Sequence, residues 1–75
     1  MVYILEMEDG IEAAFDSLEL AYNYTWDRLI DDGYDPENDT EEIFKDLSES
    51  YNDKKYDGFY IEDLAWCYAI DYFKD

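Results

Sequence analysis

Two short apolar runs open the chain, with a turn signal between them. Residues 2–7 read VYILEM and residues 11–15 read IEAAF, and both contain β-branched and aromatic residues that favour strands. Asp9-Gly10 separates them, and Asp-Gly is a strong hairpin signal because a type I′ turn needs positive φ at both central residues. We therefore expect an antiparallel hairpin of strands 2–7 and 11–15.

Apolar residues at helical spacing follow the hairpin. The positions that fall on one face of a helix are Leu18, Ala21, Tyr22, Thr25 and Leu29. Asp16 and Ser17 each offer an N-cap, and Glu19 stands three residues after Asp16, as in a capping box. Gly33 is a C-terminal stop because glycine adopts the left-handed conformation that commonly ends a helix. The pattern predicts a helix over 17–31.

A second helical pattern begins after Pro36. Its apolar stripe is Ile43, Phe44, Leu47 and Tyr51. Pro36 biases Asp35 away from helical backbone. Asp39 can cap the helix, and Glu42, three residues later, completes the spacing of a capping box. We expect a helix at about 40–51, followed by a turn from Asn52 to Gly58.

The final run, FYIEDLAWCYAIDYF at 59–73, fits two structures. Ile61, Leu64, Ala65, Tyr68 and Tyr72 have helical spacing, but residues 66–72 also alternate as in a strand. The residue types favour a strand, at about 65–73, preceded by a solvated turn that contains Glu62 and Asp63. The expected fold is α+β, a small single domain over 1–75 in the order ββααβ. Its antiparallel sheet, the N-terminal hairpin plus the C-terminal strand, packs on two helices.

The charge balance is the strongest feature of the composition. Asp and Glu number 22, Lys and Arg 5, and there is no His, so the net charge is −17. A hydrophobic fraction of 48% and an aromatic fraction of 20% favour a folded domain over a disordered acidic tail. A domain of this mass exposes roughly 4,900 Å², or about 290 Å² for each net charge. Duplex DNA has about 110 Å² for each charge. Such a surface repels nucleic acid and anionic membranes and attracts basic protein surfaces.

Several kinds of chemical site are disfavoured. Residues 31–42, DDGYDPENDTEE, have the length of an EF-hand loop, but Gly33 stands at ligand position 3 and Pro36 where the loop needs glycine. We therefore predict no metal site. The absence of His, of a glycine-rich phosphate loop and of a Ser–His arrangement argues against catalysis, so we expect no catalytic residue and no cofactor.

Compartment signals are few. Cys67 is the only cysteine, and its aromatic neighbours Trp66 and Tyr68 predict a buried, unreactive thiol, which fits a reducing compartment. The N-terminal sequence MVYILEMEDG lacks the basic and long apolar regions of a signal peptide. No apolar run approaches the roughly 20 residues of a membrane span.

The carboxylates themselves form a pattern. Glu42, Asp46 and Glu49 recur at helical spacing, with Asp53 next if the helix continues, and four residues rise about 6 Å along a helix. Such a row could engage Lys and Arg side chains that otherwise hold successive phosphates. The predicted partner-binding residues are Asp31, Asp32, Asp35, Glu37, Asp39, Glu42, Asp46, Glu49 and Asp53. An ordinary solvated surface is the simpler explanation, but such surfaces mix charge signs.

A small, acidic, Tyr-rich domain with these features resembles the phage-encoded inhibitors of host defence, which include DNA mimics and acidic anti-CRISPR proteins. The residues that carry the resemblance are DDGYDPENDTEE and the row Glu42, Asp46 and Glu49. The resemblance implies competition with DNA for the basic groove of a CRISPR effector or similar nuclease, in the cytoplasm of an infected bacterium. Two alternatives stay open: an acidic adaptor that binds a basic protein without mimicry, and halophilic adaptation.

Overall fold

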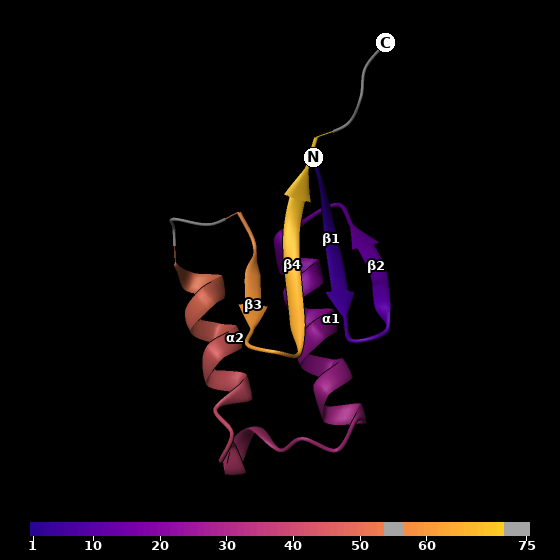
Figure 1. The fold of residues 1–75 in the computed structure, drawn as a ribbon. Helices are drawn as coiled ribbons and strands as arrows, with labels where there is room; N and C mark the ends of the chain where they lie inside the picture. The colour runs from indigo at the N-terminus through magenta and orange to yellow at the C-terminus, as the bar shows by residue number, and fades with distance from the viewer. Residues whose placement is uncertain (54–56, 72–75) are drawn as a thin grey trace.

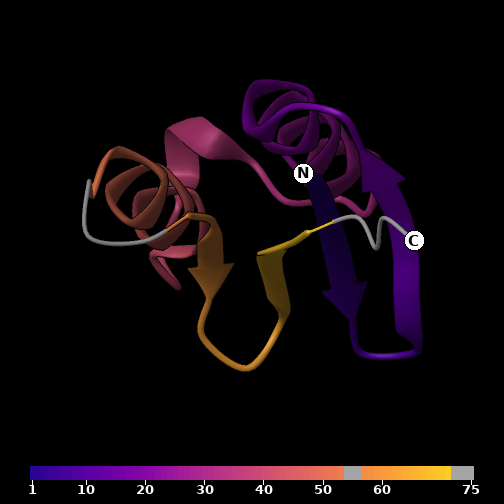
Figure 2. The same ribbon diagram turned by 90° about the horizontal axis from the view of Figure 1, so that it is seen from above.

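The computed structural model describes residues 1–53 and 57–71, and in this part of the chain four strands and two α-helices form two layers (Figure 1). The elements are β1 (Val2–Met7), β2 (Gly10–Phe15), α1 (Leu18–Asp31), the short 3₁₀ helix η1 (Pro36–Asn38), α2 (Ile43–Asn52), β3 (Phe59–Ile61) and β4 (Ala65–Ile70). The strands form one antiparallel sheet in the order β2-β1-β4-β3. Seen from above, both helices lie on the same side of this sheet (Figure 2). The predicted α+β fold with a β-hairpin, two helices and a C-terminal strand is confirmed.

The first hairpin forms where predicted, but its turn differs from the prediction. Met7 pairs with Gly10, so the two loop residues are Glu8 and Asp9 rather than Asp9 and Gly10. In this turn only Gly10 has a positive φ, of 114°. The predicted type I′ turn is therefore wrong. Gly10 instead supplies a positive φ at the start of β2, as in hairpins closed by a glycine bulge.

Both ends of α1 follow local rules. Ser17 is the N-cap, and its side chain accepts a hydrogen bond from the backbone N–H of Leu20. Gly33, with φ of 99°, ends the helix as predicted. Its N–H donates to Ile30 O, and the N–H of Tyr34 donates to Leu29 O, which is the Schellman pattern.

Helix α2 begins three residues later than predicted, at Ile43. Asp39 still caps it, because its carboxylate accepts from the N–H groups of Ile43 at 2.7 Å and Lys45 at 3.0 Å. The predicted capping-box role of Glu42 is wrong. Glu42 has left-handed backbone, with φ of 60°, and its side chain makes no capping hydrogen bond. The chain between Asp39 and Ile43 thus forms a tight turn of its own before the helix starts.

The C-terminal segment is a hairpin rather than one strand. Residues Phe59–Ile61 form the short strand β3, which the sequence did not predict, and Glu62 and Asp63 lie in the turn before β4. That turn was expected to be solvated, and both residues are exposed. The predicted strand 65–73 ends at Ile70 in the structure. Residues 72 and 73 of that prediction, and 54–56 of the predicted 52–58 turn, lie outside the described residues.

The core lies between the helices and the sheet. Leu5 and Cys67 from the two central strands and Leu29 and Leu47 from the helices are all at most 1% exposed. Tyr22 of α1 and Tyr51 of α2 stack with ring centroids 4.1 Å apart, so both cover the core as predicted. Trp26 meets Phe44 across the same helix pair at 4.7 Å. Aromatic rings therefore supply the contact between α1 and α2.

A serine joins α2 to the outer strand of the sheet. The hydroxyl oxygen of Ser50 accepts a hydrogen bond from the N–H of Tyr60. Its single proton has two acceptors within reach, the carbonyl oxygen of Tyr60 at 2.9 Å and that of Leu47 at 3.1 Å. Ser50 is 6% exposed and Tyr60 is 49% exposed, so the bonds between them are partly sheltered from water. The helix thereby satisfies the backbone groups that β3 turns away from β4.

Replacing Ser50 by alanine should lower the free energy of unfolding by about 2 kcal/mol, because the partly buried N–H and carbonyl groups of Tyr60 lose their hydrogen-bond partner. Urea denaturation would measure it. Ser48→Ala is the matched control on the same helix, since the Ser48 hydroxyl donates to the exposed carbonyl of Lys45, one turn back in the same helix. Equal losses in the two variants would contradict a special role for Ser50.

Candidate functional site

The loop between the helices uses several of its carboxylates to hold its own backbone. Asp35 caps η1 by accepting from the N–H of Glu37 at 2.9 Å, and Asp39 caps α2. Asp32 is the C-cap residue of α1 and pairs with Arg28 across one helical turn. These three predicted partner-binding residues therefore have structural roles, whereas Asp31 and Glu37 are exposed and have no such bond among those seen in the described residues.

The acidic row of α2 runs along one flank of that helix. Asp46 lies in its first turn and is half-buried, Glu49 is exposed, and Asp53 is the C-cap residue. Glu42 precedes the helix and pairs with Lys45 at 3.5 Å. The structure therefore retains Asp46 and Glu49 as the regular part of the row, about 4.5 Å apart along the helix axis.

The row points away from the other helix. Phe44 and Tyr51 face α1 through their ring contacts. Residues two apart on a helix do not share a face. Asp46 is two residues from Phe44, and Glu49 is two residues from Tyr51. The two carboxylates therefore lie on a different face of α2 from the two rings. The predicted site is thus divided between the loop at the end of the helix pair and the outer flank of α2.

A β-bulge in β2 places a carboxylate beside the only arginine of the sequence, Arg28. Leu5 pairs with Ala13 and Glu6 with Ile11, so Glu12 has no partner in β1. Glu12 turns toward α1 instead, where it forms an ion pair with Arg28 and accepts from Tyr24 Oη at 2.7 Å. The hydrogen bond to Glu12 raises the pKa of Tyr24, and Asp32 raises the pKa of Arg28. Arg28 therefore neutralises two carboxylates on the β2 side of α1.

The sheet turns large apolar side chains to the face that the helices leave uncovered. In β4, the small residues Ala65 and Cys67 face the core, whereas Trp66 is 58% exposed. Tyr60 of β3 pairs with Trp66 and is 49% exposed, and the Trp66 and Tyr68 rings lie 5.2 Å apart. This outer face, which we define by Ile4, Glu6, Ile11, Tyr60, Trp66 and Tyr68, was missed in the sequence prediction. The available signal was the alternation of Trp66, Tyr68 and Ile70 with smaller residues, but the sequence did not show which of the two sets faces solvent.

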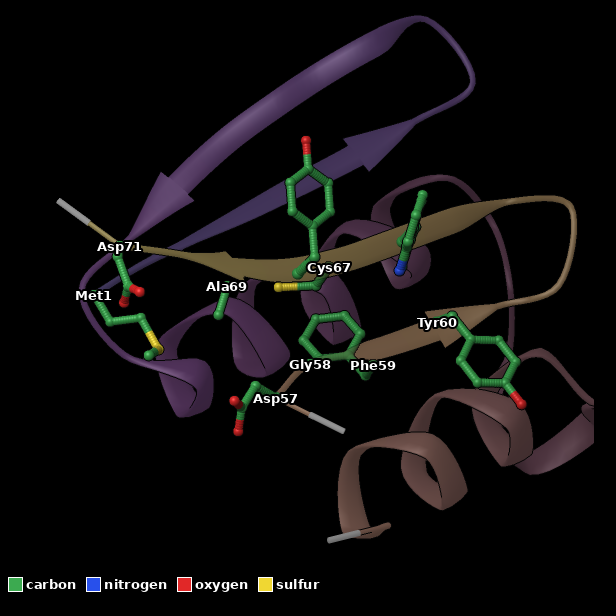
Figure 3. A pocket seen from close by; sticks show the side chains of 10 residues that line it. Met1, Asp57, Gly58, Phe59, Tyr60, Cys67, Ala69 and Asp71 are labelled. Carbon is green, nitrogen blue, oxygen red and sulfur yellow. The ribbon is translucent and has the colours of Figure 1, made fainter. Parts of the chain in front are cut away.

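A pocket of about 590 Å³ opens where β4 continues past the short strand β3 (Figure 3). Asp57 and Gly58 lie on one side of it, and Ala69 and Asp71 on the other. Tyr60, Trp66 and Tyr68 also contribute to its lining, so it adjoins the outer face. Most of the lining is apolar or aromatic, and Asp57 and Asp71 add two carboxylates to it.

Cys67 borders the pocket, but its thiol is held in the protonated form. The residue is 1% exposed, which confirms the predicted burial, and burial raises the pKa of the thiol from 9.0 to about 12. A thiolate is the reactive form of cysteine, so Cys67 is poorly suited to nucleophilic chemistry at neutral pH.

This shifted pKa predicts a loss of stability in alkali. Above about pH 9 the unfolded chain releases the thiol proton while the folded chain keeps it, so the unfolded state binds fewer protons and unfolding becomes easier as pH rises. The slope should approach about 1.4 kcal/mol per pH unit. Urea unfolding at several pH values should show a shallower decline for Cys67→Ala than for the wild type. Parallel declines would contradict this role of the thiol.

Metal-binding clusters and membrane-spanning helices are both missing from the part of the chain that the structure describes. In residues 1–53 and 57–71 no group of three or more side chains converges in a way that could hold a metal ion. The helices of the same described residues include none that is long and apolar enough to cross a membrane. Comparison of the chain with protein-family models, curated proteins and solved structures gave no match. The functional argument therefore depends on the surface chemistry described above.

Proposed function

We propose that this protein is an inhibitor that mimics nucleic acid and occupies the basic DNA-binding groove of a host defence nuclease, in particular a CRISPR effector. The observation that supports it most is a net charge of −17 on a folded domain whose acidic row, Asp46 and Glu49, lies on an outer helix flank. Negative charge at intervals on a rigid element is what a groove built for phosphates attracts.

The charge is poorly balanced within the protein, which also supports the proposal. Arg28 pairs with Glu12 and Asp32, and Lys45 pairs with Glu42. Opposite charges spaced along a helix stabilise it and like charges destabilise it. An acidic flank therefore costs stability, and binding to a basic partner is a function that would compensate for this cost.

A competition assay tests the proposal. Guide-loaded CRISPR effectors and restriction endonucleases would be mixed with a labelled DNA duplex and increasing amounts of this protein. We expect displacement of DNA from a responding nuclease, with an affinity for the protein that falls steeply between about 50 and 200 mM salt. The proposal would be overturned if the protein displaced DNA from none of the nucleases, or if its affinity did not depend on salt.

The second candidate is an acidic adaptor that binds a basic protein away from its DNA site. It is favoured by the capping roles of Asp35 and Asp39, because carboxylates that hold the loop are less available as phosphate substitutes. The same assay separates the two candidates. An adaptor would form a complex with its partner that bound DNA does not disrupt.

A further inference from the structure

The outer face of the sheet combines aromatic rings with very little charge of its own. Trp66 and Tyr60 are neighbours across β3 and β4, and Tyr68 lies beside Ile4 of β1 in the register. Glu6 is the acidic group on this face, and it lies opposite Trp66. Exposed aromatic groups of this kind commonly mark interaction sites on small domains.

Carboxylates lie around this face at both ends of β4. Two turns lie at the same end of the sheet (Figure 1). The β1–β2 turn contains Glu8 and Asp9, and the β3–β4 turn contains Glu62 and Asp63. Toward the other end, Asp57 and Asp71 line the pocket beside the aromatic rings (Figure 3). All six of these carboxylates are on exposed residues.

We infer that the outer face binds arginine side chains of the basic protein partner, with guanidinium groups stacked on Trp66 and Tyr60 and bonded to Glu6. This inference rests on the proposed function, because it assigns a second contact surface to the same inhibitor. An indole face attracts a cation, and a guanidinium is planar and weakly hydrated, so it stacks on rings better than an ammonium does. Arginine can also bond a carboxylate with two parallel N–H groups while it stacks.

Charge complementarity favours this occupant over a second copy of the chain. Each copy carries a net charge of −17, so two copies that met through this face would bring their carboxylate rims together. The protein's own arginine is not available to the face, because Arg28 pairs with Glu12 and Asp32 on the opposite side of the sheet. The guanidinium must therefore come from another molecule.

Peptide titrations followed by NMR test the inference. Nona-arginine and nona-lysine would be titrated into the ¹⁵N-labelled protein at low salt, and their Kd values measured by calorimetry. The two indole N–H signals separate the surfaces, since Trp66 is exposed and Trp26 packs between the helices against Phe44. We expect nona-arginine to shift the Trp66 indole signal and to leave the Trp26 signal nearly unchanged.

Substitution adds an energetic readout. Trp66→Ala should weaken nona-arginine binding about fivefold and nona-lysine binding less. Leu20→Ala is the matched control, because Leu20 is a 55% exposed apolar residue on α1 that lies away from this face. It should leave both affinities unchanged, and urea unfolding would confirm that both variants are folded.

Other results would overturn the inference. If the shifts were confined to residues 31–53 and Trp66→Ala bound as the wild type does, the outer face would not bind arginine, while the proposed inhibition through the acidic row would stand. Loss of DNA competition in the nuclease assay, with peptide binding to Trp66 intact, would instead overturn the proposed function alone. A stable dimer that dissociates on Trp66→Ala would assign the face to a second copy.

Discussion

Replacing Gly58 by alanine should lower the free energy of unfolding by about 3 kcal/mol. A Cβ atom at Gly58 would overlap the backbone carbonyl oxygen of Cys67 and would lie 3.0 Å from its carbonyl carbon. Neither of these atoms belongs to a flexible side chain that could move away. The start of β3 would have to separate from β4, which would expose Phe59, now 2% exposed in the core. Urea denaturation would show a lower midpoint.

Gly33→Ala provides the comparison for this prediction. Nothing lies within 4 Å of a Cβ atom at Gly33, but its φ of 99° is one that alanine adopts only with strain. That strain should cost about 1–2 kcal/mol. A loss at Gly58 no larger than the loss at Gly33 would mean that the two strands can move apart at little cost.

Reversing the charge of the α2 row, by Asp46→Lys with Glu49→Lys, should weaken binding to the nuclease that responds in the competition assay by about 100-fold. Each new lysine removes an attractive contact and adds repulsion from the basic groove. Isothermal calorimetry would measure the affinity, and circular dichroism would confirm the helical content. Asp39 is left unchanged because its carboxylate caps α2.

The matched control reverses Glu19 and Asp27 on α1. Glu19 lies in the first turn of its helix, as Asp46 does, so the helix dipole should penalise both pairs similarly. Two reversals change the charge by four units in either variant, from −17 to −13. We expect the control to lose about tenfold through weaker long-range attraction alone. Equal losses in both variants would show that total charge, rather than the α2 row, determines binding.

Local signals in the sequence were sufficient for the two strands of the first hairpin, though not for its turn, and for α1. Ser17 and Gly33 act within a few residues of themselves, through hydrogen bonds that any helix of this sequence would form. The start of α2 was less predictable, because Asp39 and Glu42 fit a capping box by spacing alone. In the structure the Asp39 carboxylate reaches Lys45, six residues on, and the turn before the helix places Glu42 in left-handed backbone.

Nonlocal contacts determine what the sequence pattern left open. Strand β3 has three residues and depends on partners on both sides, β4 and the Ser50 hydroxyl, neither of which has a local sequence signal. The sequence also left open which side chains of β4 face the core, because apolar residues occupy both of its alternating sets. The packing against the helices decides it. Leu29 of α1, Leu47 of α2 and Phe59 of β3 already fill the core, so the small side chains of Ala65 and Cys67 face inward.

The candidate site was predictable in composition but not in arrangement. The acidic residues were identified as a group, yet the sequence could not show that Asp35 and Asp39 are used to hold the backbone. It also could not show that Trp66 faces solvent. Both facts require the fold, since each depends on which of several nearby polar or apolar partners a side chain meets.

The two outer strands of the sheet differ from ordinary exposed edges, and this bears on how much of the protein a cell can hold. The Ser50 hydroxyl occupies backbone groups of β3 at Tyr60, and the bulge at Glu12 interrupts β2. Neither strand offers a regular ladder onto which another chain could add, which is how folded proteins avoid aggregation through sheet edges. A stoichiometric inhibitor, the function that we propose, must accumulate to at least the concentration of its target, and these edges would allow that accumulation without precipitation.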